Sequence, residues 1–406
     1  MIREKPILRR PFHEGFALLF AGLLFLSCGS ANALPISKSA SFATGNTNIV
    51  QVATSICSLI NTQIEDLKSR KAYSKVPPPA WIVNRLARYE QQLERAGCTS
   101  SGGGGSSSGG GVSWLSGMSC TDMATAASWR GSPITASVGW APHTGDWNDI
   151  MNYFSGGNMN KFINAKNNGA LPSIGLPMLP ESHRGQLRNC AKGQFDSYFT
   201  KIASLLKGRG LGDIVLRLGW EANLQSYPWI ADYGVNSYKQ CYRRIVRKMR
   251  AVSPQLKFDW HNGKRTRFNR TAADLYPGNA FVDYIGLSYY DRDLDNRTQA
   301  KWDESSRKGT AKNPEGIETW LNFAKSRGKK LAVSEWGITN RGDTSYYQGN
   351  KDNDLFVRNM FEFFKRNSAN LAYESYFNCT SGDPTVYLIL PENYNPKSSA
   401  MYKSLY

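Results

Sequence analysis

The sequence predicts a (β/α)8 barrel over residues 112–406, an α/β fold in which eight parallel strands alternate with helices. Two observations predict it: short apolar or β-rich runs alternate eight times with helical stretches, and the segment is long enough for one such domain. A third observation, the Gly/Ser-rich composition of residues 99–111, marks a flexible linker in front of the barrel. This alternation favours a closed barrel over an open, doubly wound sheet.

The expected strands are short runs rich in apolar and β-branched residues. They cover residues 112–117, 134–140, 171–176, 214–220, 256–261, 282–290, 331–336 and 371–377. Between them, apolar residues recur every three or four positions, which predicts helices. The clearest helical stretches are residues 186–206, 238–252, 314–327 and 354–367.

Residues 1–33 have the pattern of a secretory signal peptide. Basic residues come first, an apolar run covers residues 16–26, and Ala31-Asn32-Ala33 fits a cleavage site. The apolar run is too short to span a bilayer comfortably, and no later stretch approaches the roughly 18 apolar residues that a membrane-spanning helix needs. Cys28 loosely suggests a lipoprotein signal, but the residues before it fit poorly. We therefore expect a secreted or periplasmic protein that is cleaved near Ala33.

Residues 41–98 are predicted to form a helical hairpin. Apolar residues recur at helical spacing on both sides of Pro77-Pro78-Pro79, which indicates two helices joined by a short turn. Antiparallel helices would bring Cys57 and Cys98 together, so we expect a disulfide there. The hairpin itself is expected to act as a spacer or an oligomerisation arm.

Six cysteines remain after removal of the signal, and an even number in an exported chain indicates disulfides. Apart from Cys57 and Cys98, the sequence alone does not decide the pairing. The remaining four are Cys120, Cys190, Cys241 and Cys379. No Cys-x-x-Cys spacing or histidine ligand motif is present, so we expect neither a metal nor a cofactor.

The formal net charge of +18 acts on partners rather than on the fold. It would attract an acidic polysaccharide, a phosphate-rich cell surface or nucleic acid, and it also promotes solubility. No nucleic-acid-binding motif accompanies the charge. We therefore expect a polysaccharide partner, with charge attraction to an acidic glycan, and neither nucleic-acid binding nor a membrane span.

In a barrel of this kind, the functional residues lie at the carboxyl ends of the strands. These ends are rich in aromatic and polar side chains, which stack on and hydrogen-bond to sugars. The candidate substrate-binding residues are Trp140, His143, Trp220, Trp260, His261, Tyr289, Asp291, Trp336 and Tyr376. For Trp140, Trp260 and Trp336 a core position is an equal alternative, and Asp291 could instead cap the next segment.

Glu221 comes directly after the fourth expected strand, Glu335 lies at the end of the seventh, and the two are the candidate catalytic pair. Two carboxyl groups across a sugar-sized gap can cleave a glycosidic bond, and a retaining enzyme places them about 5 to 5.5 Å apart. Arg217, four residues before Glu221, lies on the same face of its strand and could keep a nucleophile ionised. Tyr290 could do the same from the sixth strand. Arg217 could equally be only a buried ion-pair partner.

Five motifs in chain order carry a resemblance to a known family. They are Arg-Leu-Gly-Trp-Glu at 217–221, Tyr-Pro-Trp at 227–229, Phe-Asp-Trp-His-Asn at 258–262, Val-Asp-Tyr-Ile-Gly-Leu-Ser-Tyr-Tyr-Asp at 282–291 and Ser-Glu-Trp-Gly at 334–337. From about residue 112 onward, the chain resembles glycoside hydrolase family 26, a β-mannanase-type family of clan A retaining (β/α)8 hydrolases. The resemblance implies that Glu221 is the acid/base, Glu335 the nucleophile and Tyr290 the tyrosine that hydrogen-bonds the nucleophile. Arg217 matches the arginine that precedes the acid/base by four residues in this family.

Trp220 departs from the pattern of this family. The β-mannanases that the chain resembles usually carry histidine immediately before the acid/base, and tryptophan is larger and cannot accept a hydrogen bond. We therefore expect a different substrate from mannan, but still glycosidic cleavage: a secreted, retaining, endo-acting hydrolase of a β-linked polysaccharide, such as an acidic exopolysaccharide. The alternative is a non-catalytic glycan-binding barrel that serves as a scaffold in polysaccharide export or cell-surface assembly.

Overall fold

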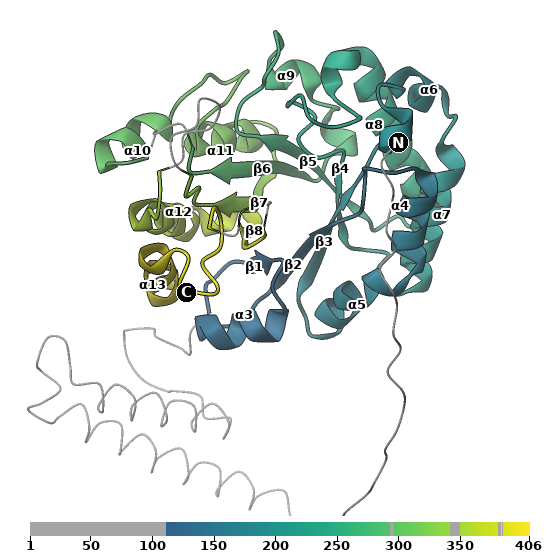
Figure 1. The fold of residues 1–406 in the computed structure, drawn as a ribbon. Coiled ribbons are helices and arrows are strands. Elements are labelled where there is room, and N and C mark those ends of the chain that lie inside the picture. The colour runs from purple at the N-terminus through teal and green to yellow at the C-terminus, as the bar shows by residue number, and fades with distance from the viewer. Residues whose placement is uncertain (1–110, 293–295, 342–349, 381–382, 384) are drawn as a thin grey trace, which may run out of the picture. The chain divides into compact units, whose positions relative to one another are not determined.

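Eight parallel strands close into one barrel in the order β1 to β8, as predicted (Figure 1). The structure is a computed structural model and describes residues 111–292, 296–341, 350–380, 383 and 385–406. The strands are β1 (Ser116–Ser119), β2 (Ala136–Trp140), β3 (Leu171–Leu176), β4 (Val215–Leu218), β5 (Lys257–Gly263), β6 (Tyr284–Tyr290), β7 (Lys330–Gly337) and β8 (Leu371–Phe377). The predicted signal peptide, the helical hairpin and the Cys57–Cys98 disulfide lie outside the described residues.

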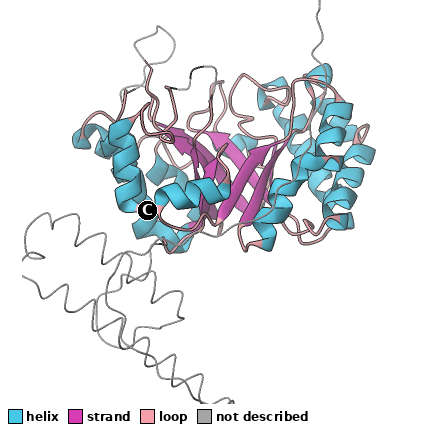
Figure 2. Cartoon of the chain, turned by 60° about the horizontal axis from the view of Figure 1, so that its bottom comes forward, coloured by secondary structure: helices cyan, strands magenta, loops and turns pink. Residues whose placement is uncertain are grey.

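Helices surround the strands (Figure 2). They are α3 (Met123–Arg130), α4 (Trp147–Ser155), α5 (Asn160–Asn167), α6 (Leu187–Lys192), α7 (Asp196–Gly208), α8 (Val235–Val252), α9 (Ala272–Leu275), α10 (Gln299–Ser305), α11 (Ile317–Lys325), α12 (Asp354–Asn367) and α13 (Pro396–Leu405). Within the described ranges, no helix is both long and apolar enough to cross a membrane.

The single helix expected over residues 186–206 is in fact two helices, α6 and α7. Gly193 ends α6 with a φ of +97°, in the left-handed region, and its N–H donates to the carbonyls of Asn189 and Cys190. Glycine adopts this conformation without the steric cost that a side chain brings. The helical periodicity of the sequence continues across this break, so the periodicity alone predicts one helix instead of two.

The barrel interior is narrow and polar toward its carboxyl end. Its apolar part is a small cluster of Ala136, Val138, Val215, Ala332 and Tyr373. The Tyr373 hydroxyl donates to Oδ2 of the buried Asp259 at 2.8 Å. The small side chains of Ala136 and Ala332 leave room in the interior for larger polar groups.

Most aromatic side chains lie instead between the strands and the helices. Trp336, for example, packs against Phe364 of α12 and Tyr376 of β8 with ring centroids 5.4 and 4.9 Å apart. Because successive side chains of a strand point to opposite faces, an inward Glu335 places its neighbour Trp336 in this outer layer.

Two disulfides connect the four cysteines that the sequence left unpaired. Cys120, just after β1, bonds to Cys379, just after β8, and so joins the first and last strands of the barrel. Cys190 of α6 bonds to Cys241 of α8. Both pairs link elements that are far apart in the sequence and adjacent in the fold.

Replacing Cys120 and Cys379 together by alanine should lower the free energy of unfolding by roughly 2 to 5 kcal/mol, because this disulfide closes a long loop of the unfolded chain. Urea denaturation of the oxidised protein measures the loss. The matched control is the Cys190→Ala/Cys241→Ala variant, whose sequence separation is 51 rather than 259 residues. The control should lose about 1.4 kcal/mol less; a larger loss in the control would contradict the explanation.

Candidate active site

Glu221 lies on a sharp turn that follows β4. Gly219 and Glu221 have φ values of +57° and +53°, and this left-handed conformation is rare for a residue with a side chain. Holding Glu221 there costs about 1 to 3 kcal/mol. The turn is fixed by the backbone N–H of Glu221, which donates to the carbonyl of His261 at 2.8 Å. The carboxyl group of Glu221 is thereby presented at the end of the barrel.

Glu335, on β7, is buried and is surrounded by hydrogen-bond donors from three other strands. Its Oε1 accepts from Nη1 of Arg217 at 2.8 Å and from Nε1 of Trp140 at 2.9 Å. Its Oε2 accepts from the hydroxyl of Tyr290 at 3.2 Å. Donors of this kind favour the ionised carboxylate. Glu335, Arg217, Tyr290 and Trp140 were all singled out from the sequence, and the structure brings them together.

Arg217 is fully buried and is held from several sides. Its Nη2 donates to the carbonyl of Gly139 at 2.7 Å, and its guanidinium lies over the Trp140 ring, 4.6 Å from the centroid. Its orientation toward Glu335 is therefore set by β2 as well as β4. A buried positive charge with these partners stabilises the negative charge on Glu335.

The environment of Glu221 is the opposite of that of Glu335. Burial, followed by the negative charge of Glu335, raises the pKa of Glu221 to about 7. The hydroxyls of Ser288 and Tyr227 and the charge of Arg292 oppose this rise only in part. Near neutral pH, Glu221 can therefore hold a proton beside an ionised Glu335, which is the division of roles that acid-assisted nucleophilic cleavage needs.

His261 lies between the two carboxyl groups and is almost completely buried. Its Nε2 is 3.0 Å from the Ser288 hydroxyl, and its Nδ1 is 4.0 Å from Oε1 of Glu335. Burial, with a smaller contribution from Arg217, holds the pKa of His261 well below its ordinary value. The imidazole is therefore neutral, and Arg217 supplies the positive charge next to Glu335.

Trp220 and His143 belong to a packed aromatic cluster with Tyr227 and Trp229. The ring of Trp220 meets Trp229 edge-on at 4.6 Å and His143 at 5.6 Å. The indole N–H of Trp229 donates to the carbonyl of Trp220 at 2.9 Å. Only 3% of Trp220 is exposed, so its main role in the structure is to support the loop that carries Glu221.

Four predicted substrate-binding residues lie in the outer layer rather than at the cleft. Trp260, Tyr289, Trp336 and Tyr376 are all buried on the helix side of their strands. Trp260, for example, stacks on Phe323 of α11 and donates to the Tyr238 hydroxyl of α8. Along each strand, these outward-facing aromatic residues alternate with residues that face the barrel interior. A motif at a strand end therefore contains both kinds of residue, and the sequence does not show which of them faces the cleft.

Asp291 is buried within a group of asparagines rather than open to a cleft. Its Oδ1 accepts from the amides of Asn296 and Asn350, and its Oδ2 accepts from the amide of Asn353. These hydrogen bonds connect the end of β6 to the start of α12. Asp291 thus positions the loops around the site.

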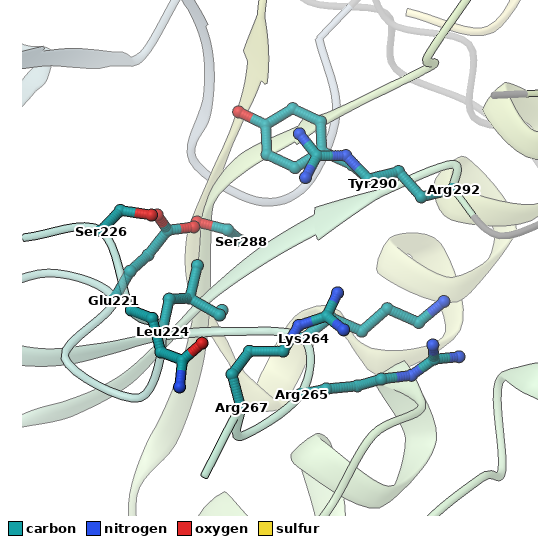
Figure 3. Close-up of a pocket in the computed structure, with 11 residues that line it drawn as sticks. Glu221, Leu224, Ser226, Lys264, Arg265, Arg267, Ser288, Tyr290 and Arg292 are labelled. Atoms are coloured by element: carbon teal, nitrogen blue, oxygen red, sulfur yellow. The ribbon is translucent and has the colours of Figure 1, made fainter. Parts of the chain in front are cut away.

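A cavity of about 390 Å³ opens beside Glu221, Ser288 and Tyr290 (Figure 3). Its wall contains four basic residues, Lys264, Arg265, Arg267 and Arg292, which the sequence analysis did not select. The signal was present as Lys264-Arg265-Thr266-Arg267, directly after β5. The other lining residues are Leu224, Gln225, Ser226 and Gly263.

Metal ligation has no evident centre in the described part of the chain. No group of three or more His, Cys, Asp or Glu side chains there is arranged to hold an ion. The described chemistry of the site is that of two carboxyl groups, an arginine, a neutral histidine and hydroxyl donors.

Replacing Glu335 by glutamine should lower the pKa of Glu221 from about 7, because the neighbouring negative charge is removed. Carbon-13 NMR of the glutamate carboxyl groups over a pH titration measures this value. The matched control is Glu392→Gln, which removes an exposed carboxylate; it should leave the Glu221 titration in place. An unchanged pKa in Glu335→Gln would contradict the described coupling.

Comparisons with known proteins relate part of the barrel to a known family. Residues 190–306 match the model of glycosyl hydrolase family 26. The match includes Arg217, Glu221, His261 and Tyr290 and ends before Glu335. A search of curated proteins finds no match.

Solved structures resemble the chain in fold. The family 26 endo-β-1,4-mannanase catalytic domain of Bacillus sp. JAMB-750 has a TM-score of 0.50 and 15% identity, and the alignment covers 71% of this chain and 85% of that one. Mannanase BCman of Bacillus subtilis has a TM-score of 0.48 and 17% identity over 72% of this chain and 85% of that one. The sequence match confirms the predicted resemblance to this family over residues 190–306, and the barrel that contains them is a glycoside hydrolase domain.

Proposed function

We propose that this barrel is a retaining, endo-acting hydrolase of a β-linked polysaccharide, with Glu221 as acid/base and Glu335 as nucleophile. One observation carries the proposal: Glu335 accepts hydrogen bonds from Arg217, Trp140 and Tyr290, whereas burial and Glu335 raise the pKa of Glu221 to about 7. Two carboxyl groups whose environments favour opposite protonation states are the arrangement that a glycosidase uses.

The reaction would proceed in two steps. In the first, a carboxylate oxygen of Glu335 attacks the anomeric carbon, the glycosidic C–O bond breaks, and the proton of Glu221 passes to the leaving oxygen. In the second, Glu221 takes a proton from water, whose oxygen attacks the anomeric carbon and releases Glu335. Arg217 and Tyr290 stabilise the charge of Glu335 before the attack and after its release.

The substrate is proposed to be an acidic, β-linked polysaccharide outside the cell. Export is expected from the N-terminal signal pattern and is consistent with the two disulfides of the described residues. The acidic character is supported by the net charge of +18 and by the basic residues around the cavity. The solved structures described above are named as mannanases, so mannan is one of the polymers to test as a substrate.

Replacing Glu335 by alanine should lower kcat by at least about a thousandfold, because no other group can form the glycosyl intermediate. The measurement is reducing-end release from neutral and acidic β-glycans, including β-1,4-mannan and β-1,4-galactan. A retained anomeric configuration, followed by proton NMR, tests the mechanism. Binding of several glycans by wild-type protein without cleavage would instead support the alternative of a non-catalytic, glycan-binding scaffold.

The pH dependence of cleavage should report the protonation of Glu221. An acid with a pKa of about 7 donates its proton below that pH, so kcat/KM should fall about tenfold per pH unit above pH 7. A 2,4-dinitrophenyl glycoside of the same sugar is the control, because its leaving group needs no proton. With this substrate, the fall in kcat/KM above pH 7 should disappear. If kcat/KM still falls above pH 7 with that substrate, a group other than Glu221 causes the pH dependence.

A further inference from the structure

We infer that the cavity beside Glu221 binds a uronic acid residue on the leaving-group side of the bond that is cut. This inference rests on the proposed function, because Glu221 as proton donor defines the leaving-group side. It adds the position of the negative charge along the polymer and the residues that recognise it.

The position follows from the carboxyl group that the cavity contains. Glu221 lines the cavity, whereas Glu335 is not among the described residues that line it. Glu335 instead accepts hydrogen bonds from Arg217 and Trp140. A proton donor contacts the leaving oxygen and a nucleophile contacts the anomeric carbon. A sugar in this cavity is therefore on the side that departs.

The charge of the wall selects the chemistry of that sugar. Lys264, Arg265 and Arg267 come from the segment after β5, and Arg292 comes from the segment after β6. Among the described lining residues Glu221 alone is acidic, and it is protonated when it acts as the acid. The described wall of the cavity therefore carries four basic side chains and one acidic side chain (Figure 3).

The basic groups are held in different ways. Arg292 lies over the Tyr290 ring at 4.9 Å and donates from Nη2 to the Tyr387 hydroxyl at 3.0 Å. Lys264 lies 5.1 Å from the centroid of the Tyr289 ring. These contacts orient both side chains before any ligand binds, which reduces the entropy lost on binding.

Arg265 and Arg267 differ in how much of their charge faces the occupant. Arg265 forms an ion pair with Glu315 at 3.1 Å, which offsets its charge. Arg267 is exposed at the cavity and is anchored by its backbone N–H, which donates to the carbonyl of Asn223 at 2.9 Å. Of these two arginines, Arg267 therefore presents more of its charge to the cavity.

The composition of the wall points to a carboxylate rather than a neutral sugar. Tyr290 is the aromatic residue among the described lining residues, so the cavity offers little surface for stacking on a pyranose ring. A guanidinium matches the planar geometry of a carboxylate. A uronic acid is a sugar that carries this group at C6.

The test uses one polymer in two forms. The β-glycan that wild-type protein cleaves in the panel above is oxidised at about half of its C6 hydroxyl groups, which converts those sugars to uronic acids. Wild-type protein should cleave the oxidised form with the higher kcat/KM at low ionic strength. In the Lys264→Gln/Arg267→Gln variant this preference should fall by roughly tenfold, as expected for two partly exposed charge contacts.

A matched control removes a basic side chain elsewhere. Arg247, exposed on α8 outside the cavity, is replaced by glutamine, and the preference should remain. Product ends locate the charge: mass spectrometry should find uronic acid enriched at the new non-reducing ends, which come from the leaving group. Enrichment at the new reducing ends, or an equal loss of preference in Arg247→Gln, would overturn the inference.

A binding measurement separates this inference from the catalytic proposal. Titration calorimetry compares oxidised and neutral oligosaccharides of β-1,4-mannan and β-1,4-galactan with the Glu335→Ala protein, with and without Lys264→Gln/Arg267→Gln. The oxidised ligands should bind more tightly, and the two substitutions should abolish the difference. If they do not, the inference fails even where cleavage depends on Glu335. If they do, it gains support even where cleavage fails.

Discussion

The buried ion pair between Arg217 and Glu335 is the interaction on which the site depends. With only 0% and 8% of their side chains exposed, neither charge can rely on water, so each requires the other. Arg217 is in turn held by the carbonyl of Gly139 and by the ring of Trp140. Because β2, β4 and β7 all contribute, this ion pair forms only in the closed barrel.

Glu221 is subject to a different constraint. It occupies a left-handed conformation on the turn after β4, supported by the packed rings of Trp220 and Trp229 and by its own hydrogen bond to β5. This support places a carboxyl group with little hydration near the negative charge of Glu335, and the result is a raised pKa. The neutral His261 and Ser288 complete the connection between the two carboxyl groups without adding a charge.

The basic cavity is built from residues adjacent to those that set the chemistry. Lys264 and Arg267 follow the strand that carries His261, and Arg292 follows the strand that carries Tyr290. The same strands therefore position both the reacting groups and the charges that we propose to recognise the substrate. Segments that follow barrel strands can change substrate choice without moving the groups on the strands themselves.

The barrel could be predicted from the sequence alone, together with most strand positions and the central residues Arg217, Glu221, Tyr290 and Glu335. Apolar periodicity and polar strand ends are local patterns, so they can be recognised without a structure. It did not separate inward from outward residues: Tyr289 and Tyr290 are both aromatic at a strand end, and only the closed barrel decides which one faces the cleft.

Three further features likewise depend on tertiary structure. They are the disulfide between Cys120 and Cys379, the left-handed turn at Glu221, and the single cavity that Lys264, Arg267 and Arg292 line together. Each joins elements far apart in the chain or requires a backbone angle that local preference opposes. Distances between such groups are set by strand order and register, and no local pattern in the sequence encodes them.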